Sequence, residues 1–362
     1  MKKIAIISWD MSIIGGINQV VATLAKGLCE KYEIYIISLV KKNENSVYIF
    51  PEKVHNIYYI LEKDARGREV IRKGKKRLKE LLREERISTV LLMGFQVSLP
   101  VILMAGRRGI NYVFCDHEAL MSRWKEYKIT AVRFFTALFS NKVVTLTENN
   151  AKDYCKKFHL SKKKVMFIYN SISDNVMKYR GKYQENSKVI LSVGRFSPEK
   201  GYEMLVDVAK EVFQTYPDWK WHIYGSGETF EQIKSKIIKN QLENNVILKG
   251  EVTDVSQIYR QASIYVLTSY REGLPLVLLE AKANHLPCIS FDIVSGPREI
   301  VRSDVDGILI PPFDVEKMTD KIKLLIGDKE LRIKMSKEAD KNLWKFSSET
   351  VMNQWFELID NL

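Results

Sequence analysis

Residues 270–302 read YREGLPLVLLEAKANHLPCISFDIVSGPREIVR, and the rest of the chain is organised around this stretch. The apolar, β-prone run from Ile264 to Ser269 precedes it and predicts a short buried strand. Gly273 and Pro275 then predict a turn into a helix from about Pro275 to Asn284, with the proline in the first helical turn, where its missing N–H costs nothing. Strand, turn and helix in this order indicate an open α/β sheet.

Two carboxylates in this stretch, Glu272 and Glu280, are candidate ligand contacts. Glu272 falls on the loop at the carboxyl end of the strand, the edge at which open α/β sheets bind ligands. Glu280 falls one or two turns into the helix. Helix-start amides favour a phosphate, and carboxylates accept hydrogen bonds from hydroxyls. The pair therefore favours a phosphorylated, polyhydroxylated ligand, although an acid near a helix start and a solvated helix glutamate have the same spacing.

A second candidate anion site lies upstream, in the run Gly194-Arg-Phe-Ser-Pro-Glu-Lys-Gly. The run follows a predicted strand and opens a predicted helix that begins at Tyr202. Arg195 and Lys200 flank the turn, and two cations beside helix-start amides favour a diphosphate. Simple surface charge is the alternative interpretation.

The amino-terminal half repeats the same rhythm and offers two weaker candidates. Gly15 and Gly16 lie in the first loop of a predicted βαβ unit. They do not form a GxGxxG fingerprint, so a tight turn competes with the interpretation that small residues let a ligand approach the backbone. His117 stands at the carboxyl end of another predicted strand. It is a candidate contact to a ligand hydroxyl or phosphate, and a structural histidine is the alternative.

Length and cysteine usage limit the class of protein. A chain of 362 residues predicts two domains. The four cysteines are scattered without metal-binding spacing, which favours reduced thiols in a cytoplasm over a disulfide framework or a zinc site. The apolar run near the start is too short for a signal peptide and is interpreted as the first strand. The sequence contains no run of eighteen apolar residues, so we expect no membrane span.

The positive charge is concentrated in the first half. Residues 1–190 hold 35 lysines and arginines against 18 acids, whereas residues 191–362 hold 22 against 26. Such asymmetry favours contact with an anionic membrane or nucleic acid over a role in solubility alone. A basic helix near residues 66–86 and an aromatic-basic stretch at 121–138 are both candidate contacts. The second stretch is equally consistent with a helix packed on the sheet through Phe134, Phe135 and Leu138.

Five motifs together resemble the retaining glycosyltransferases of family 4, which have the GT-B fold. They are GRFSPEKG (194–201), YGSGE (224–228), GEVTD (250–254), EGLPLVLLE (272–280) and DGILIPPFD (306–314). The resemblance implies an α/β protein of two Rossmann-like, doubly wound parallel-sheet domains. The first is an acceptor-binding domain, 1–170 plus 346–362, and the second a nucleotide-sugar-binding domain, 188–345. The polar, aperiodic stretch 171–187 is predicted to be the linker.

The resemblance also implies residue roles. Arg195 and Lys200 would hold the donor diphosphate, Glu272 the hydroxyls of the transferred sugar, and Glu280 the ribose hydroxyls. His117 would reach the sugar. The remaining implied contacts are backbone contacts to sugar, phosphate, uracil or acceptor, at Gly15, Gly16, Gly250, Val252, Gly273, Leu274, Pro275 and Leu276. One departure concerns the hinge: Asn170-Ser-Ile-Ser stands where the family often has Asn-Gly-Ile-Asp.

The expected reaction is retaining transfer of a hexose or N-acetylhexosamine from a UDP-sugar. Residues 290–300 resemble family members that build bacterial surface polysaccharides, which implies an oligosaccharide or polyprenyl-diphosphate-linked acceptor. The catalytic residues would be Glu272, Arg195, Lys200 and His117. The resemblance implies that no cofactor or metal is needed, and the Asp304-x-Asp306 pattern falls in a turn before a strand rather than forming a metal-binding motif. We expect a cytoplasmic enzyme held peripherally on the inner face of the membrane.

Two other functions are compatible with parts of the sequence. A nucleotide-sugar epimerase shares the architecture but requires further acid and base carboxylates, which the sequence does not clearly provide. A non-enzymatic protein that binds an anionic surface would explain the basic half but leaves Glu272 and Glu280 without a role. Nucleic acid is not the expected partner, because the basic half lacks a helix-turn-helix or RNP-like pattern.

Overall fold

The structure is a computed structural model that describes residues 1–362 except 45, 47, 66, 107–108, 179 and 253–256. The chain divides into two compact units. Unit 1 comprises Met1–Ser171 and Ser348–Leu362, and unit 2 comprises Ile172–Ser347. Each unit has its own hydrophobic core and its own parallel sheet. The predicted arrangement of two doubly wound α/β domains is confirmed.

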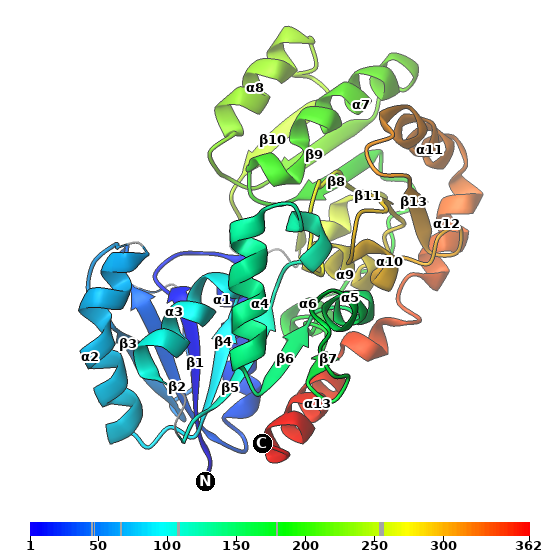
Figure 1. Ribbon diagram of the computed structural model, residues 1–362. Helices are drawn as coiled ribbons and strands as arrows, with labels where there is room; N and C mark the ends of the chain where they lie inside the picture. Colours follow the sequence, from blue (N-terminus) through cyan, green and yellow to red (C-terminus); the bar gives the residue numbers. More distant parts are fainter. Residues whose placement is uncertain (45, 47, 66, 107–108, 179, 253–256) are drawn as a thin grey trace. The chain divides into compact units, whose positions relative to one another are not determined.

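The sheet of unit 1 has the order β3-β2-β1-β4-β5-β6-β7 in the described part of the chain (Figure 1). Every pairing between neighbours is parallel. Strands that are buried on both faces consist of consecutive apolar residues, so they can be predicted from the sequence. Their bounds are β1 Lys3–Asp10, β2 Glu33–Val40, β3 Val54–Tyr59, β4 Thr89–Met93, β5 Asn111–Asp116, β6 Lys142–Thr145 and β7 Val165–Phe167.

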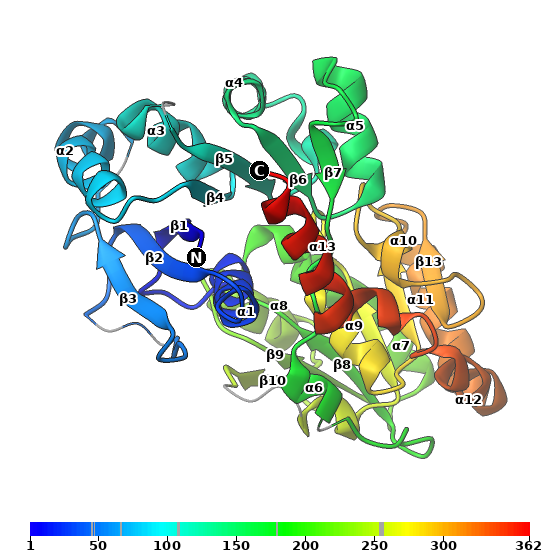
Figure 2. The ribbon, with the colours of Figure 1, turned by 90° about the horizontal axis from the view of Figure 1, so that it is seen from below.

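Helices cover both faces of this sheet (Figure 2). One face carries α2, α3, α4 and α5, and the other carries α1 and α13. Parallel strands require such crossover helices, and the apolar stripe of each helix is buried on the sheet. The bounds are α1 Gly16–Leu28, α2 Arg68–Glu84, α3 Phe95–Ala105, α4 Tyr127–Phe139, α5 Glu148–Phe158 and α13 Ser348–Asp360, with a 3₁₀ turn, η1, at Leu120–Arg123.

The last helix, α13, belongs to unit 1 although all of unit 2 precedes it in the sequence. It packs against α1 and buries Trp355. The carboxylate of Asp360 accepts a hydrogen bond of 2.7 Å from the Tyr32 hydroxyl and pairs with the Lys31 ammonium at 2.5 Å. The Asn111 side-chain amide donates to the Leu362 carbonyl at 2.9 Å. The first unit is therefore discontinuous in sequence.

The described strands of unit 2 form a second parallel sheet in the order β10-β9-β8-β11-β12-β13. Trp221 on β9 is fully buried, and its indole N–H donates to the Ser192 hydroxyl at 3.0 Å. The strand bounds are β8 Val189–Val193, β9 Lys220–Tyr224, β10 Val246–Gly250, β11 Ile264–Leu267, β12 Cys288–Phe291 and β13 Gly307–Ile310.

The main core of unit 2 lies between its sheet and the helices α7, α8 and α11, while α9 packs against β11 and β12. The helices are α6 Asp174–Lys178, α7 Tyr202–Thr215, α8 Phe230–Lys239, α9 Leu276–Ala283, α10 Pro297–Ile300, α11 Val315–Gly327 and α12 Lys329–Glu338. The 3₁₀ turns are η2 Pro198–Lys200, η4 Tyr259–Gln261 and η5 Leu343–Phe346.

The stretch predicted as a linker, 171–187, belongs almost entirely to unit 2. It contains the short helix α6, and Ile172 and Val176 are buried. The Tyr183 hydroxyl donates to the Ser263 carbonyl at 3.0 Å. The polar, aperiodic composition of this stretch gives no sign of the few side chains that anchor it. The predicted start of the second domain, residue 188, is therefore later than the observed start of unit 2 at Ile172.

Candidate active site

The site of unit 2 lies where its strand order reverses, between the neighbouring strands β8 and β11. The connections that leave these two strands run in opposite directions, which opens a crevice outside their carboxyl ends. The loop after β8 carries Arg195 and Lys200, and the loop after β11 carries Glu272. Sequence positions more than seventy residues apart are therefore neighbours at this edge of the sheet.

Lys200 and Glu272 form an ion pair. Lys200 Nζ lies 2.7 Å from Glu272 Oε1, and the two side chains are only 20% and 11% exposed. The hydroxyl of Ser269 donates to the same carboxylate oxygen at 2.7 Å. The hydroxyl of Thr268 donates to the Lys200 carbonyl at 2.9 Å and joins the two loops. Partial burial strengthens such an ion pair relative to a surface pair, because less water screens it.

Two glycines of the YGSGE motif explain why this motif accompanies the Arg195 loop. A Cβ on Gly225 would lie 1.9 Å from the Gly194 carbonyl oxygen, and a Cβ on Gly227 would lie 2.3 Å from the Phe196 carbonyl oxygen. Both glycines also have positive φ. Because no larger residue fits, the two loops pack backbone against backbone and hold the loop that carries Arg195 and Lys200 in one conformation.

Arg195 differs from Lys200 in its surroundings. Its side chain is exposed, and the structure shows no ion pair for it within the described residues. An exposed guanidinium on the loop that also carries Lys200 leaves one cation directly accessible to an anionic ligand. A planar guanidinium can also make bidentate hydrogen bonds to phosphate oxygens.

Glu280 lies inside α9 and is partly buried. The hydroxyl of Tyr259 donates to Glu280 Oε2 at 2.6 Å, and no cation pairs with this carboxylate in the described part of the chain. Burial raises the pKa of Glu280, since it penalises the charged form. The other carboxylate oxygen keeps its capacity to accept hydrogen bonds from ligand hydroxyls.

The start of α9 is held by the SFDIVSGPREI segment. Gly296 has φ of 100°, and a Cβ there would lie 2.8 Å from both the Gly273 carbonyl oxygen and Pro275 Cδ. Pro275 is the residue before the helix, which begins at Leu276, so the helix begins one residue later than predicted. No side chain caps this helix start. Its first amides therefore remain suited to an anion.

The segment predicted to lie by the uracil is described only in part. Gly250 ends β10, and its carbonyl accepts a hydrogen bond from the Gly225 amide at 2.8 Å. Leu274 is buried and Val252 half-buried. Thr253 and Asp254 of the predicted GEVTD turn lie outside the described residues, so the proposed contact of this turn stays a prediction.

In unit 1 the strand order reverses between β1 and β4, and the loop after β1 carries Gly15 and Gly16. A Cβ on either glycine would meet no atom within 4 Å. Gly15 has φ of −174°, an extended conformation open to any residue. Neither packing nor backbone geometry therefore requires glycine here, and close approach of a ligand remains a sufficient reason for both.

His117 is the first residue after β5 in unit 1. The residue is half-buried, and its Nε2 atom is buried without a hydrogen-bond partner among the described residues. Burial lowers the pKa of His117 to about 4, so the imidazole is neutral near pH 7. A neutral histidine at this edge of the sheet has a donor and an acceptor for a hydroxyl group, and the contact of His117 with the sugar stays a prediction.

The structure also bears on metals and membrane spans. Across the described residues we find no cluster of three or more histidine, cysteine, aspartate or glutamate side chains that could hold a metal ion. Asp306 of the Asp-x-Asp pattern is instead buried and paired with Lys282 at 2.8 Å and Arg302 at 2.6 Å. The four cysteines are free. None of the described helices combines the length and hydropathy needed to cross a bilayer.

Two Rossmann-like units, each with its own parallel sheet, are the architecture of glycosyltransferases of the GT-B type. The Glycosyltransferase Family 4 model matches residues 14–176, and the Glycosyl transferases group 1 model matches residues 175–342. The two matches together span all but the ends of the chain. The protein is an enzyme that belongs to the family 4 glycosyltransferases.

Individual relatives match over most of their length. An uncharacterized glycosyltransferase of Haemophilus influenzae is 28% identical over 98% of this chain and 99% of its own. The amylovoran biosynthesis glycosyltransferase AmsD of Erwinia amylovora is 27% identical over 75% of this chain and 76% of its own. A Staphylococcus aureus TarM variant, solved with UDP, α-GlcNAc-glycerol and fondaparinux, has the same fold, with a TM-score of 0.84 at 17% identity over 99% of each chain.

Sequence reasoning missed Ser269, Thr268 and Tyr259. All three act through hydroxyl groups that fix a carboxylate or a loop. Ser269 and Thr268 end the apolar run that predicts β11, where a polar pair at a strand end is a usable signal. Tyr259 lies 21 residues before Glu280 in a 3₁₀ turn, and no local pattern connects the two.

Proposed function

We propose that the protein transfers a hexose or N-acetylhexosamine from a UDP-sugar to a saccharide acceptor, with retention of configuration, in the synthesis of a bacterial surface polysaccharide. The observation that carries this proposal is the Lys200–Glu272 ion pair beside the exposed Arg195 at the switch point of unit 2. The UDP bound in the TarM structure supports the donor, and the role of AmsD in amylovoran biosynthesis supports the pathway class.

In this proposal the two cations stabilise the leaving group. Negative charge develops on the diphosphate as the bond to the sugar breaks, and cations positioned in advance stabilise it without reorganisation. Arg195 is ready to contact the diphosphate, whereas Lys200 must share its ammonium with Glu272. The arrangement supplies the charge that a divalent metal would otherwise supply, and we propose that the enzyme needs none.

In this proposal, the carboxylates of Glu272 and Glu280 bind the donor by accepting hydrogen bonds from its hydroxyl groups. Glu272 has one oxygen bonded to Lys200 and Ser269, so its second oxygen is available to a sugar hydroxyl. Glu280 is oriented by Tyr259 and accepts from the ribose hydroxyls. Each role requires an ionised carboxylate, because a protonated one loses part of its acceptor capacity.

Retention follows a front-face route in this proposal. The bond between the anomeric carbon and the diphosphate oxygen breaks, and the acceptor oxygen bonds to that carbon on the same face. The acceptor hydroxyl gives its proton to the leaving phosphate oxygen. The acceptor that fits the basic unit is a saccharide on a polyprenyl diphosphate, since its carrier lies in a membrane.

The membrane contact proposed for unit 1 has a defined surface, which we call the α2–α4 face. α3 packs against both α2 and α4 (Figure 1). α4 exposes Tyr127 by 81%, Phe135 by 45% and Leu138 by 44%. The exposed cations of α2 are Arg68, Arg72, Lys73, Lys75, Lys76, Arg77, Lys79 and Arg83. The exposed apolar side chains of α4 and the cations of α2, on either side of α3, together suit an anionic bilayer surface.

UDP release across a panel of UDP-sugars, with and without a lipid-linked saccharide, tests the proposed reaction. We expect turnover with one donor and its loss in Glu272→Gln and Lys200→Ala. Lys188→Ala is the matched control, because Lys188 is an exposed ion-paired lysine of unit 2 that precedes β8, at the opposite end of this strand from the switch-point crevice. Conversion of the sugar without UDP release would identify an epimerase, and no turnover with any donor would refute the transferase proposal.

Sedimentation with vesicles tests the α2–α4 face. We expect Phe135→Ala/Leu138→Ala to reduce binding to anionic vesicles at low salt severalfold, since each buried apolar side chain contributes about 1.5–3 kcal/mol at most. Leu324→Ala is the matched control, because Leu324 on α11 is similarly exposed, by 41%. Equal binding of all three proteins would refute this surface.

A further inference from the structure

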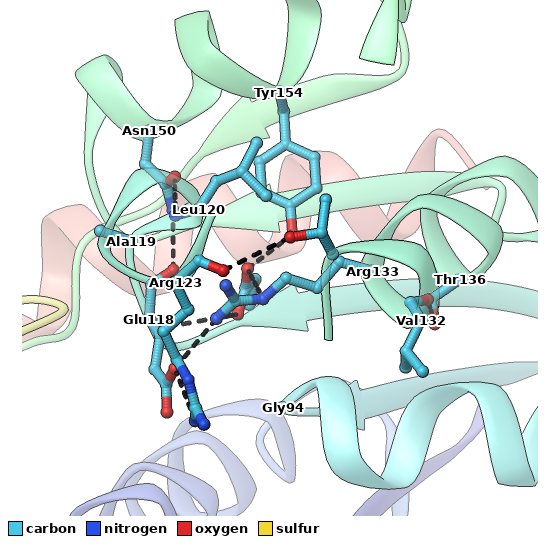
Figure 3. Close-up of polar contacts among 12 residues, drawn as sticks. Gly94, Glu118, Ala119, Leu120, Arg123, Val132, Arg133, Thr136, Asn150 and Tyr154 are labelled. Atoms are coloured by element: carbon cyan, nitrogen blue, oxygen red, sulfur yellow. Dashed lines mark hydrogen bonds and ion pairs between the residues drawn. The ribbon is translucent and has the colours of Figure 1, made fainter. Parts of the chain in front are cut away.

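A buried arginine bridges the two acidic residues that flank His117, and Figure 3 shows this arginine, Arg133, with one of them, Glu118. Arg133, on α4, is fully buried. Its Nε lies 3.2 Å from Asp116 Oδ2, and its Nη2 lies 3.0 Å from Glu118 Oε2. The guanidinium also stacks 4.8 Å from the centre of the Phe95 ring, at the start of α3. One side chain therefore contacts the residue before His117 and the residue after it.

A second helix fixes the same loop from another direction. Tyr154 on α5 donates its hydroxyl to Asp116 Oδ2 at 2.5 Å. Asn150, also on α5, accepts from the Leu120 amide at 2.8 Å and donates to the Glu118 carbonyl at 3.0 Å. Figure 3 shows Asn150, Tyr154 and Arg133 converging on the segment that carries Glu118. The backbone on both sides of His117 is thereby held.

Folding stability alone does not explain the ion-pair cluster of Arg133, Asp116 and Glu118. Buried ion pairs pay a desolvation cost that their attraction rarely exceeds, and apolar replacements are often neutral or stabilising. Two nitrogens of Arg133, Nε and Nη1, lack a well-formed hydrogen bond despite burial. The cluster nevertheless lies at the carboxyl end of β5, the edge where such sheets bind ligands. The cluster therefore has a better explanation in the conformation that it imposes on the loop after β5 than in the free energy of folding.

His117 itself remains without a partner. Its Nε2 is buried and makes no hydrogen bond in the described part of the protein, while the residues on either side are each held by two or more contacts. A buried ring nitrogen left unsatisfied costs free energy unless a ligand supplies the missing bond. The loop is therefore rigid in its backbone and unsatisfied at one atom.

We propose that Arg133 is a positioning residue of the transfer reaction, which bridges Asp116 and Glu118 so that His117 presents Nε2 to a substrate hydroxyl. The proposal rests on the proposed function and extends it to a residue remote from the donor motifs. A neutral imidazole offers one donor and one acceptor, which suits a hydroxyl. A phosphate would favour a charged ring, so the hydroxyl is the ligand group that this environment selects.

A double-mutant cycle tests the proposal through kcat and the KM for the donor. Lysine cannot bridge two carboxylates as a guanidinium does, so we expect Arg133→Lys to lower kcat about 10- to 100-fold, the range that misplacement by about 1 Å produces. KM for the donor should change less than about twofold if chemistry limits turnover. In a His117→Ala background, Arg133→Lys should have almost no further effect on kcat, because coupled residues are not additive.

Arg332→Lys is the matched control for loss of a buried arginine. Arg332, in unit 2, is 4% exposed and donates to the carbonyl of Ile326 at 2.8 Å. Its substitution should lower the melting temperature and leave kcat unchanged. The paired variant Arg133→Met/Asp116→Asn removes the buried charges together, so that it folds without an unpaired charge yet lacks the bridge. We expect the kcat of this paired variant to fall by about as much as the kcat of Arg133→Lys.

NMR titration of the His117 ring gives a readout that needs no turnover. In the wild type the ring should titrate near pH 4. In the paired variant the loosened loop exposes the ring, and its pKa should rise toward about 6.5. Multiplicative losses in the cycle, or an unchanged His117 titration in the paired variant, would overturn the proposal. Failure of the transferase proposal appears separately, as absence of turnover in the wild type.

Discussion

Glu272 and Glu280 lie eight residues apart in one motif, yet their surroundings differ. Glu272, on the loop, accepts hydrogen bonds from Lys200 and Ser269. Glu280, inside α9, accepts from the hydroxyl of Tyr259 and has no cationic partner in the described part of the chain. The ion pair fixes Glu272 through charge, whereas burial raises the pKa of Glu280. The same residue type is thus positioned by two different physical effects.

The different surroundings of Glu272 and Glu280 suit different proposed roles, the first in the transfer step and the second in donor binding. In the proposed reaction, Glu272 shares its cation, Lys200, with the incoming diphosphate and so lies where charge changes. In the same proposal, Glu280 carries a desolvated charge that no cation among the described residues neutralises, and hydrogen bonds from ligand hydroxyls offset this cost. Substitutions at the two positions should therefore separate kcat from KM and activity from stability.

The largest expected effect is on the Lys200–Glu272 pair. Glu272→Gln and Lys200→Ala should each lower kcat about 10²–10³-fold, the loss typical for one group that stabilises developing charge. The double variant should lose little more than either single variant, because the two residues act as a unit. Steady-state kinetics of the four proteins checks this, and fully multiplicative losses would show two independent contacts.

Glu280→Gln should affect donor binding and stability in opposite directions. Loss of a charged acceptor should raise the KM for the UDP-sugar about 10-fold, since hydrogen bonds to charged groups contribute about 1.5–3 kcal/mol. The melting temperature should rise by about 2–4 °C, the shift that 1 kcal/mol produces in a domain of this size. A lower melting temperature would show that the carboxylate stabilises the fold.

The raised pKa of Glu280 predicts a pH dependence of donor binding. As pH falls, Glu280 takes up a proton at a higher pH than an ordinary glutamate, whose pKa is 4.5. The KM for the donor should then rise toward acid pH in the wild type and stay constant in Glu280→Gln. The folded state binds this proton more tightly than the unfolded state, so the stability advantage of the variant should shrink as pH falls. Parallel KM profiles in the two proteins would contradict the assignment.

The smallest expected effect is that of Ser269→Ala. It removes one neutral donor from Glu272 and leaves the ion pair with Lys200 in place. A hydrogen bond of this kind contributes about 0.5–1.5 kcal/mol, so kcat should fall only about 2- to 12-fold. A loss as large as that of Glu272→Gln would place Ser269 in direct contact with substrate.

Local patterns predicted the parts of the fold and site that depend on local sequence. The apolar runs located the strands, and the glycine-bounded turns located Arg195, Lys200 and Glu272 at strand ends. Tertiary packing decided the rest. Arg133 lies in a stretch that reads as aromatic and basic, but it is buried, whereas its neighbours Phe135 and Leu138 are exposed. Periodicity cannot predict that Arg133 is buried, because its carboxylate partners, the buried Asp116 and the partly exposed Glu118, lie at the end of β5 and in the loop after it.

The position of α13 has a consequence for synthesis of the chain. The helix packs on unit 1 but is translated only after the whole of unit 2. At about 5–20 residues per second, the ribosome takes roughly 9–35 s to progress from the end of the first segment of unit 1 to the beginning of this helix. Unit 2 has its complete sequence first. During that interval the nascent unit 1 exposes the surface that α13 later covers. We expect chaperone binding and premature termination to affect folding of unit 1 most at this stage of synthesis.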